Sequence, residues 1–337
     1  MKEIYDNARD LMKGFCRVCK KCDGKACADE VPGMGGLGSG ASFHANIKAL
    51  EQYALNMLVI HNVVDTDTTI SLFDKKMSLP IIAAPIGGVS FNMGGKITEV
   101  DYISSVLKGC KAKNIIGCIG DGVPDFIHET GNKVIKEIGG YGIPFIKPWE
   151  DKELFEKIEK AEKFGVDIIG MDIDAAGLVT LRKMGRPVTP KSPEKLKKII
   201  ESTSKKFIIK GVMTVTDAKI AVDIGANGIV VSNHGGRVMD YARGSADVLP
   251  DIADAVKGKI TLMVDGGVRS GADVLKMLAL GADFVMIGRP FSIAALGGLQ
   301  KGVETYIEKL HTELEQHMVL TGTKSVTSVQ REIIHKD

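Results

Sequence analysis

Eight short apolar runs, separated by helix-like segments, constrain the fold of this 337-residue chain more than any other feature. Runs that are apolar throughout are typical of strands buried on both faces of a parallel sheet. The segments between them repeat apolar residues at helical spacing, and two of them, 216–224 and 270–280, are followed by glycines that suit a helix C-terminus. Such repetition favours an α/β fold, a TIM (β/α)₈ barrel, over an open sheet. The runs are residues 79–85, 115–120, 144–148, 167–173, 206–212, 228–232, 261–265 and 284–288.

The two ends of the chain depart from this repeat. Residues 1–45 are rich in glycine and cysteine, and we expect them to form an extension or cap, followed by a barrel over residues 46–337. Residues 302–318 carry apolar side chains at helical spacing and predict a last helix that covers the barrel.

Four of the six cysteines are clustered in the extension, which suggests metal or redox chemistry in a reducing compartment. The first three have the spacing of iron–sulfur ligands in bacterial-type ferredoxins, whereas the last gap is longer than usual there. A tetrahedral zinc site is the alternative, and the sequence leaves both open. The predicted ligands are Cys16, Cys19, Cys22 and Cys27.

Composition excludes other classes of protein. The net charge is +2 and aromatic residues make up 5% of the chain, which argues against a nucleic-acid binder. No apolar run approaches the roughly 18 residues of a membrane span. The first six residues lack the apolar core of a signal peptide, so we expect a cytoplasmic protein.

The segment Ser232-Asn233-His234-Gly235-Gly236-Arg237 predicts an acid–base site at the end of a strand. Histidine exchanges protons near neutral pH, and an arginine three residues later offers a planar fork to a carboxylate. The two glycines between them clear space around the imidazole.

Two further segments predict a phosphate site. Asp265 to Gly271 and Gly288-Arg289-Pro290 follow the last two predicted strands, where barrels often bind phosphate. Glycines let backbone N–H groups approach an anion, and arginine pairs with phosphate oxygens. The residues predicted to bind the cofactor here are Asp265, Gly267, Arg269, Gly288 and Arg289.

These segments resemble the FMN-dependent α-hydroxy-acid oxidase/dehydrogenase family, which includes glycolate oxidase, lactate oxidase and the flavin domain of flavocytochrome b2. The resemblance covers about residues 40–325 and is strongest in the last third. It implies FMN at the mouth of a TIM barrel, with Lys210 beside the N1/O2 edge of the flavin. The other residues that it assigns to the cofactor are Ala84, Pro85, Ile86, Gly87, Gly120 and Ser232.

The resemblance also implies the reaction: oxidation of a small 2-hydroxy acid, such as L-lactate or glycolate, to the 2-oxo acid. His234 would be the base, Arg237 would bind the carboxylate, and flavin N5 would accept the hydride. An aspartate orients the histidine in this family; we assign that role to Asp172, with Asp174 as its rival.

The substrate side departs from the family pattern. Where the family has a tyrosine in a Gln-Leu-Tyr segment, this chain has Phe145-Ile146-Lys147. Lys147 is either a substituted anion donor or one half of a structural ion pair. Arg182 and Arg186 are the candidates for a family arginine after the fourth strand.

Two other functions compete with oxidation. One is an FMN-dependent isomerase of the type 2 isopentenyl diphosphate isomerase kind, and the other is a non-catalytic flavin and metal redox sensor. If the protein is an oxidase or dehydrogenase, we expect a small anionic substrate and an electron acceptor, which is oxygen, a quinone or a redox protein. The resemblance further suggests a homo-oligomer.

Overall fold

The computed structural model describes residues 1–178, 181, 184–186 and 188–336. Eight parallel strands close into a barrel in the order β10-β11-β4-β5-β6-β7-β8-β9. Each lies in one of the predicted runs or begins one residue before it, so the TIM-barrel prediction is confirmed. The strands are β4 (Ile81–Ala83), β5 (Ile116–Ile119), β6 (Ile143–Ile146), β7 (Ile168–Asp172), β8 (Lys206–Val212), β9 (Gly228–Val231), β10 (Thr261–Val264) and β11 (Phe284–Ile287).

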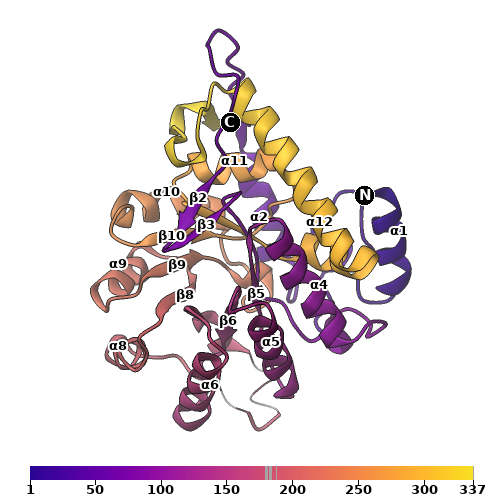
Figure 1. Ribbon diagram of the computed structural model, residues 1–337, viewed down its shortest axis with the longest axis vertical. Coiled ribbons are helices and arrows are strands. Elements are labelled where there is room, and N and C mark those ends of the chain that lie inside the picture. Colours follow the sequence, from indigo (N-terminus) through magenta and orange to yellow (C-terminus); the bar gives the residue numbers. More distant parts are fainter. Residues whose placement is uncertain (179–180, 182–183, 187, 337) are drawn as a thin grey trace.

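Helices surround the barrel on its outer side (Figure 1). Serine and threonine side chains cap several of them; Ser270, for example, accepts the backbone N–H of Asp273 in a capping box. The long helix α12 contains the predicted segment 302–318. The helices are α4 (Glu99–Ala112), α5 (Phe126–Glu137), α6 (Asp151–Lys163), α8 (Pro193–Glu201), α9 (Val215–Asp223), α10 (Ser245–Val256), α11 (Gly271–Ala279) and α12 (Arg289–Leu320).

The N-terminal residues lie against the barrel. Helix α1 (Lys2–Leu11) packs on α12, as Figure 1 shows, and α2 (Ala41–Glu51) contacts the turn after β9. Helix α2 runs across residue 45, and the division of the chain at this residue stays a prediction. The remaining elements are α3 (Val89–Asn92), the strand pair β1 (Tyr53–Leu55) and β12 (Ile334–Lys336), the strand pair β2 (Ile70–Leu72) and β3 (Lys75–Met77), and short 3₁₀ turns.

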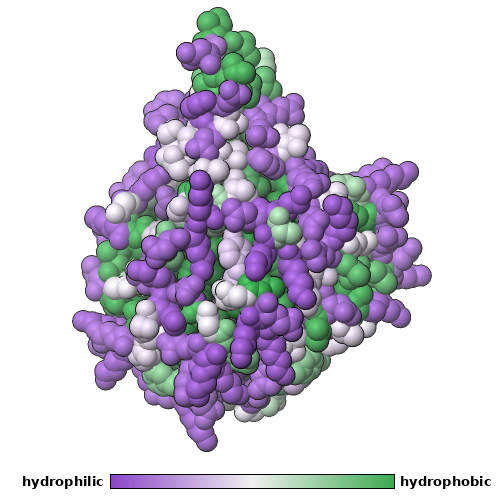
Figure 2. Space-filling view, in the orientation of Figure 1, coloured by the Kyte–Doolittle hydropathy of each residue, from purple (hydrophilic) through white to green (hydrophobic). Residues whose placement is uncertain are grey.

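The loop between β1 and β2 projects at the top of Figure 1, and Figure 2 shows that its tip is apolar. Met57 and Ile60 in this loop are 73% and 101% exposed. The expected homo-oligomer stays a prediction, as does the cytoplasmic location. Among the described residues, no helix combines the length and the apolar character that crossing a membrane requires.

Candidate active site

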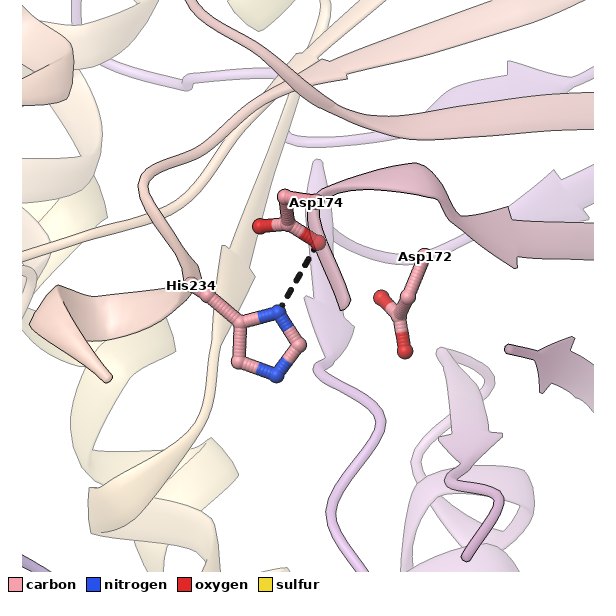
Figure 3. A group of neighbouring side chains, drawn as sticks. All are labelled: Asp172, Asp174 and His234. Carbon is pink, nitrogen blue, oxygen red and sulfur yellow. Dashed lines mark hydrogen bonds and ion pairs between the residues drawn. The ribbon is translucent and has the colours of Figure 1, made fainter. Parts of the chain in front are cut away.

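His234 lies in the 3₁₀ turn η2 (His234–Gly236) after β9, and its Nδ1 lies 3.0 Å from Oδ1 of Asp174. Figure 3 shows the imidazole turned toward Asp174, while the carboxylate of Asp172 stands apart. A carboxylate only accepts hydrogen bonds, so Nδ1 carries the proton in the neutral ring and Nε2 keeps a lone pair. The ring is therefore oriented to accept a proton at Nε2.

The assignment of Asp172 as the partner of His234 is wrong, because Asp174 makes this contact. Asp172 ends β7 and lies opposite Lys210 in the register of β7 and β8, so its Oδ1 pairs with the Lys210 ammonium at 3.4 Å. Asp174 lies beyond the strand, in the 3₁₀ turn η1 (Ile173–Gly177). Gly211 provides the space, since a Cβ atom there would lie 2.6 Å from Cβ of Asp174.

The carboxylate of Asp174 is ionised at neutral pH. Burial alone would raise its pKa, but the positive charges of His234, Lys210 and Lys147 outweigh burial and lower the pKa below its usual range. An ionised Asp174 is the form that stabilises an imidazolium.

Lys210 is a buried, permanent cation beside this pair. Its Nζ lies 3.5 Å from Oδ2 of Asp265 and donates to Oγ of Ser232 at 3.1 Å. Burial lowers the pKa of Lys210, but Asp265 and Asp172 raise it by more, so the net shift is upward. The Ser232 hydroxyl also accepts the backbone N–H of His234 at 3.0 Å and thereby joins the lysine to the histidine loop.

The backbone of His234 is held in an unusual conformation, with φ of 57°. Non-glycine residues rarely adopt this left-handed region, and they persist there only when their surroundings fix them. Asn233 provides this support, because its Oδ1 accepts from Nδ2 of Asn46 at 2.8 Å and from the N–H of Gly236 at 3.1 Å. Sequence reasoning missed Asn46, whose side chain is contributed by α2 from nearly 190 residues away.

Arg237 does not present a free fork at the barrel mouth. Its Nη1 donates to the carbonyl oxygens of Gly33 at 2.6 Å and Gly35 at 3.1 Å. Its Nη2 donates to Oδ1 of Asn92 at 3.1 Å. Three of its five N–H groups are thus used to hold the N-terminal segment, and two are left for a ligand.

Gly267, Arg269 and Arg289 line one pocket at the ends of β10 and β11, as the phosphate prediction requires. Burial, followed by the charges of Arg237 and Arg269, lowers the pKa of Arg289 to about 9. Arg289 also lies over the ring of Phe43, at 3.9 Å from its centroid. An anion in this pocket would offset the repulsion between the arginines.

In the segment between β10 and α11, two buried polar atoms have no hydrogen-bond partner among the described residues. They are Nε of Arg269, a donor, and Oδ1 of Asp265, an acceptor. Buried polar atoms are normally satisfied, so this pair indicates a ligand with both an anionic group and a hydroxyl. The phosphate and the ribityl hydroxyls of FMN supply these groups, and the residues fit this cofactor.

Residues 84–87 form the loop after β4, and all four are partly exposed. A Cβ atom at Gly120 would lie 3.1 Å from the backbone nitrogen of Gly87, so glycine lets the loops after β4 and β5 approach. Glu99 fixes the end of the loop by accepting the N–H groups of Gly88 at 2.9 Å and Val89 at 2.7 Å. The role of residues 84–87 in supporting the flavin ring stays a prediction.

Lys147 follows β6, and its backbone N–H donates to Oδ2 of Asp121 at 3.1 Å. Asp121, which the sequence did not single out, also accepts from Nε1 of Trp149 at 2.5 Å and pairs with Lys157 at 2.6 Å. The ammonium of Lys147 makes no hydrogen bond or ion pair with any residue in the described ranges. Of its two predicted roles, the structural ion pair therefore has no support.

Of the two candidates for the family arginine after the fourth strand, Arg186 is the one in the described part of the chain. Arg186 pairs with Glu153 at 2.6 Å and with Asp125 at 3.0 Å, and its guanidinium lies over the ring of Trp149. It is therefore engaged away from His234. Arg182 lies outside the described residues.

The four clustered cysteines all line a second pocket, together with Arg289. The structure thus brings together Cys16, Cys19, Cys22 and Cys27, and their metal stays a prediction.

Comparison with known proteins identifies the family. The model of the FMN-dependent dehydrogenase family matches residues 33–187 and 180–336. A 4-hydroxymandelate oxidase from Amycolatopsis orientalis is 30% identical over 91% of this chain and 95% of that protein. An L-lactate dehydrogenase from Pseudomonas entomophila is 29% identical over 90% of this chain and 92% of that protein. A crystal structure of mandelate oxidase has a TM-score of 0.81 at 27% identity, over 100% of this chain and 97% of that chain. The chain belongs to the FMN-dependent dehydrogenase family, as an FMN-dependent enzyme of the α-hydroxy-acid oxidase/dehydrogenase type.

Proposed function

We propose that this enzyme oxidises a small 2-hydroxy acid to the corresponding 2-oxo acid, with His234 as the base. The observation that carries the proposal is the 3.0 Å contact between Nδ1 of His234 and Asp174, which leaves Nε2 available to a ligand. When bound, FMN supplies the acceptor for the hydride that leaves C2 of the acid.

Residues of the chain handle the proton. Nε2 of His234 accepts the proton of the 2-hydroxyl group, and the ionised Asp174 stabilises the imidazolium that results. The buried cation Lys210 stabilises negative charge that develops beside it.

Lys147 and Arg237 bind the carboxylate of the acid. The Lys147 ammonium has no partner among the described residues, and Arg237 retains two N–H groups. A lysine is a compact point charge, unlike the tyrosine of the related enzymes, and it binds any nearby anionic group. The replacement of tyrosine by Lys147 therefore favours a substrate acid whose carboxylate, or a second anionic group, lies near the end of β6.

Asp172, Asp174 and His234 also have ligand atoms within 4.8 Å of one another, a grouping that could hold a metal ion. The Lys210 ammonium pairs with Asp172 at 3.4 Å, and its charge opposes a second cation at this place. We therefore interpret His234 as a base and not as a metal ligand. Relatives named as an oxidase and as a dehydrogenase support oxidation over isomerisation.

An anaerobic titration of the flavin-loaded enzyme tests this proposal. Lactate, glycolate, mandelate and a dicarboxylic 2-hydroxy acid are added in turn while the visible spectrum is recorded. We expect at least one of them to bleach the flavin and to yield its 2-oxo acid. An oxidised spectrum with every acid, in a protein that dithionite reduces, would favour the isomerase or the sensor.

A further inference from the structure

The loop between α1 and α2 contains four free cysteines that face one pocket. Cys16, Cys22 and Cys27 are partly buried, whereas Cys19 is exposed. The family match begins at residue 33, so the cysteines lie outside it. The chemistry of the active site uses none of them.

The spacing of the sulfur atoms distinguishes a single ion from a cluster. With Zn–S bonds of about 2.3 Å, tetrahedral zinc holds its thiolates only about 3.8 Å apart. In the described part of the chain, one group of three His, Cys, Asp or Glu residues has ligand atoms that all lie within 4.8 Å of one another. This group is Asp172, Asp174 and His234, and it contains no cysteine. No three of the four sulfurs therefore lie within 4.8 Å of one another. This arrangement is looser than tetrahedral zinc requires, and it suits a centre that places its own atoms between the thiolates.

The surroundings of the sulfurs suit a negatively charged centre. Nη2 of Arg269 donates to Sγ of Cys22 at 3.5 Å, and the backbone N–H of Val18 donates to Sγ of Cys16 at 3.4 Å. Arg289 lines the pocket as well. Hydrogen bonds to sulfur and nearby positive charge are among the features that set the potential of iron–sulfur clusters.

The cysteine pocket adjoins the cofactor pocket. Cys19, Cys22 and Arg289 line both of them. Arg289 also donates to the carbonyl oxygen of Gly235 at 2.9 Å, next to His234. Arg289, which belongs to one of the predicted phosphate loops, thus lines the cysteine pocket and contacts the turn that carries His234.

We propose that Cys16, Cys19, Cys22 and Cys27 bind a four-iron iron–sulfur cluster that carries electrons out of the active site. This electron-transfer role, unlike cluster binding itself, rests on the proposed oxidation. Each hydroxy acid releases two electrons and two protons. Two successive one-electron reductions of the cluster, each followed by transfer to a one-electron carrier protein, remove both electrons. Both protons pass to solvent.

The test uses the full chain, purified without oxygen and loaded with FMN. We expect about four iron and about four acid-labile sulfide atoms per chain, and a low-temperature EPR signal after reduction by dithionite. Cys16→Ala should lose most of the iron, whereas Cys110→Ala, a cysteine buried in the barrel, should keep it. Full FMN content in both variants shows that the barrel is folded. Zinc without sulfide, an FMN-loaded protein without metal, or iron that survives Cys16→Ala would each overturn the cluster.

Addition of the hydroxy acid in place of dithionite separates the two proposals. We expect the acid to bleach the flavin and then to produce the EPR signal of the cluster. Bleaching without that signal would overturn the electron-transfer role and leave the oxidation standing. A dithionite-induced signal with no bleaching by any acid would overturn the oxidation and leave the cluster standing.

Discussion

The loops after β8 to β11 and those after β5 to β7 form two unlike sides of the same barrel mouth. The first side carries His234, Arg269 and Arg289 in segments that resemble those of the family, together with Lys210 in β8. The second side has Lys147 at the place of a family tyrosine and a buried network around Asp121. In the proposed function the first side, called the cofactor side, holds FMN, and the second, called the substrate side, binds the acid, so we expect the second side to change with the substrate.

Removal of the base is the strongest test of the cofactor side. His234→Ala should slow flavin reduction by the acid roughly 10³- to 10⁴-fold, because it removes the proposed base that accepts the hydroxyl proton. Anaerobic rapid mixing measures the rate. The exposed His335 provides the matched control, His335→Ala, which should react at the normal rate. Equal rates in all three proteins would refute the role of His234.

Asp172 and Asp174, at and just after the end of β7, connect the two sides, because Asp174 contacts His234 and Asp172 pairs with Lys210. Asp174→Asn should slow flavin reduction roughly 10²- to 10³-fold, because it removes the charge that stabilises the imidazolium. Asp172→Asn should leave the imidazole contact intact and act through Lys210, with a shift in the flavin midpoint potential. Rates and potentials of both variants are compared. A larger loss of rate in Asp172→Asn would restore the original assignment.

The substrate side is tested through its lysine. Lys147→Met should raise KM for the acid roughly 10- to 100-fold with a smaller change in kcat, because one charge-assisted contact is lost. The uncharged amide of the same acid should lose no affinity. Lys152→Met on the exposed face of α6 is the matched control. An unchanged KM would place the carboxylate elsewhere.

The smallest expected effect concerns the stability of the substrate side. Burial, opposed by Asp121, lowers the pKa of His128 to about 4. Between this value and the unfolded pKa of about 6.5, the unfolded chain binds a proton that the native chain does not. The free energy of unfolding should therefore fall by about 1 kcal/mol from pH 6.5 to 5.5 through this group.

Denaturant titrations across this range measure the effect. His128→Asn should remove that part of the pH dependence, whereas His335→Asn should preserve it. If the free energy of unfolding changed with pH in the same way in His128→Asn as in the wild type, the result would contradict a buried, neutral His128.

The same two sides differ in how far the sequence predicts them. All eight strands were predictable because most of their residues are buried and apolar, with Lys206 and Lys210 in β8 and Asp172 in β7 among the exceptions. His234, Arg269 and Arg289 were predictable because short motifs carry them. Lys147 was found only as a departure from the family pattern.

What sequence reasoning got wrong or missed depends on contacts that residue spacing does not encode. The choice between Asp172 and Asp174 depends on the residue at which β7 ends, which the sequence does not fix. Gly211, which leaves space for Asp174, was the one sequence feature that favoured Asp174. The contacts of Arg237 with Gly33 and of Asn233 with Asn46 join segments about 200 residues apart, so no local pattern announces them.

A single-turnover experiment tests the central claim most directly. The flavin-loaded enzyme is mixed without oxygen with one equivalent of the acid that bleaches it, and the 2-oxo acid is then quantified. The account predicts one 2-oxo acid for every two electrons that the enzyme takes up, with neither product nor bleaching in His234→Ala on the same timescale. Product formed at the full rate by His234→Ala, or bleaching without any 2-oxo acid, would contradict it.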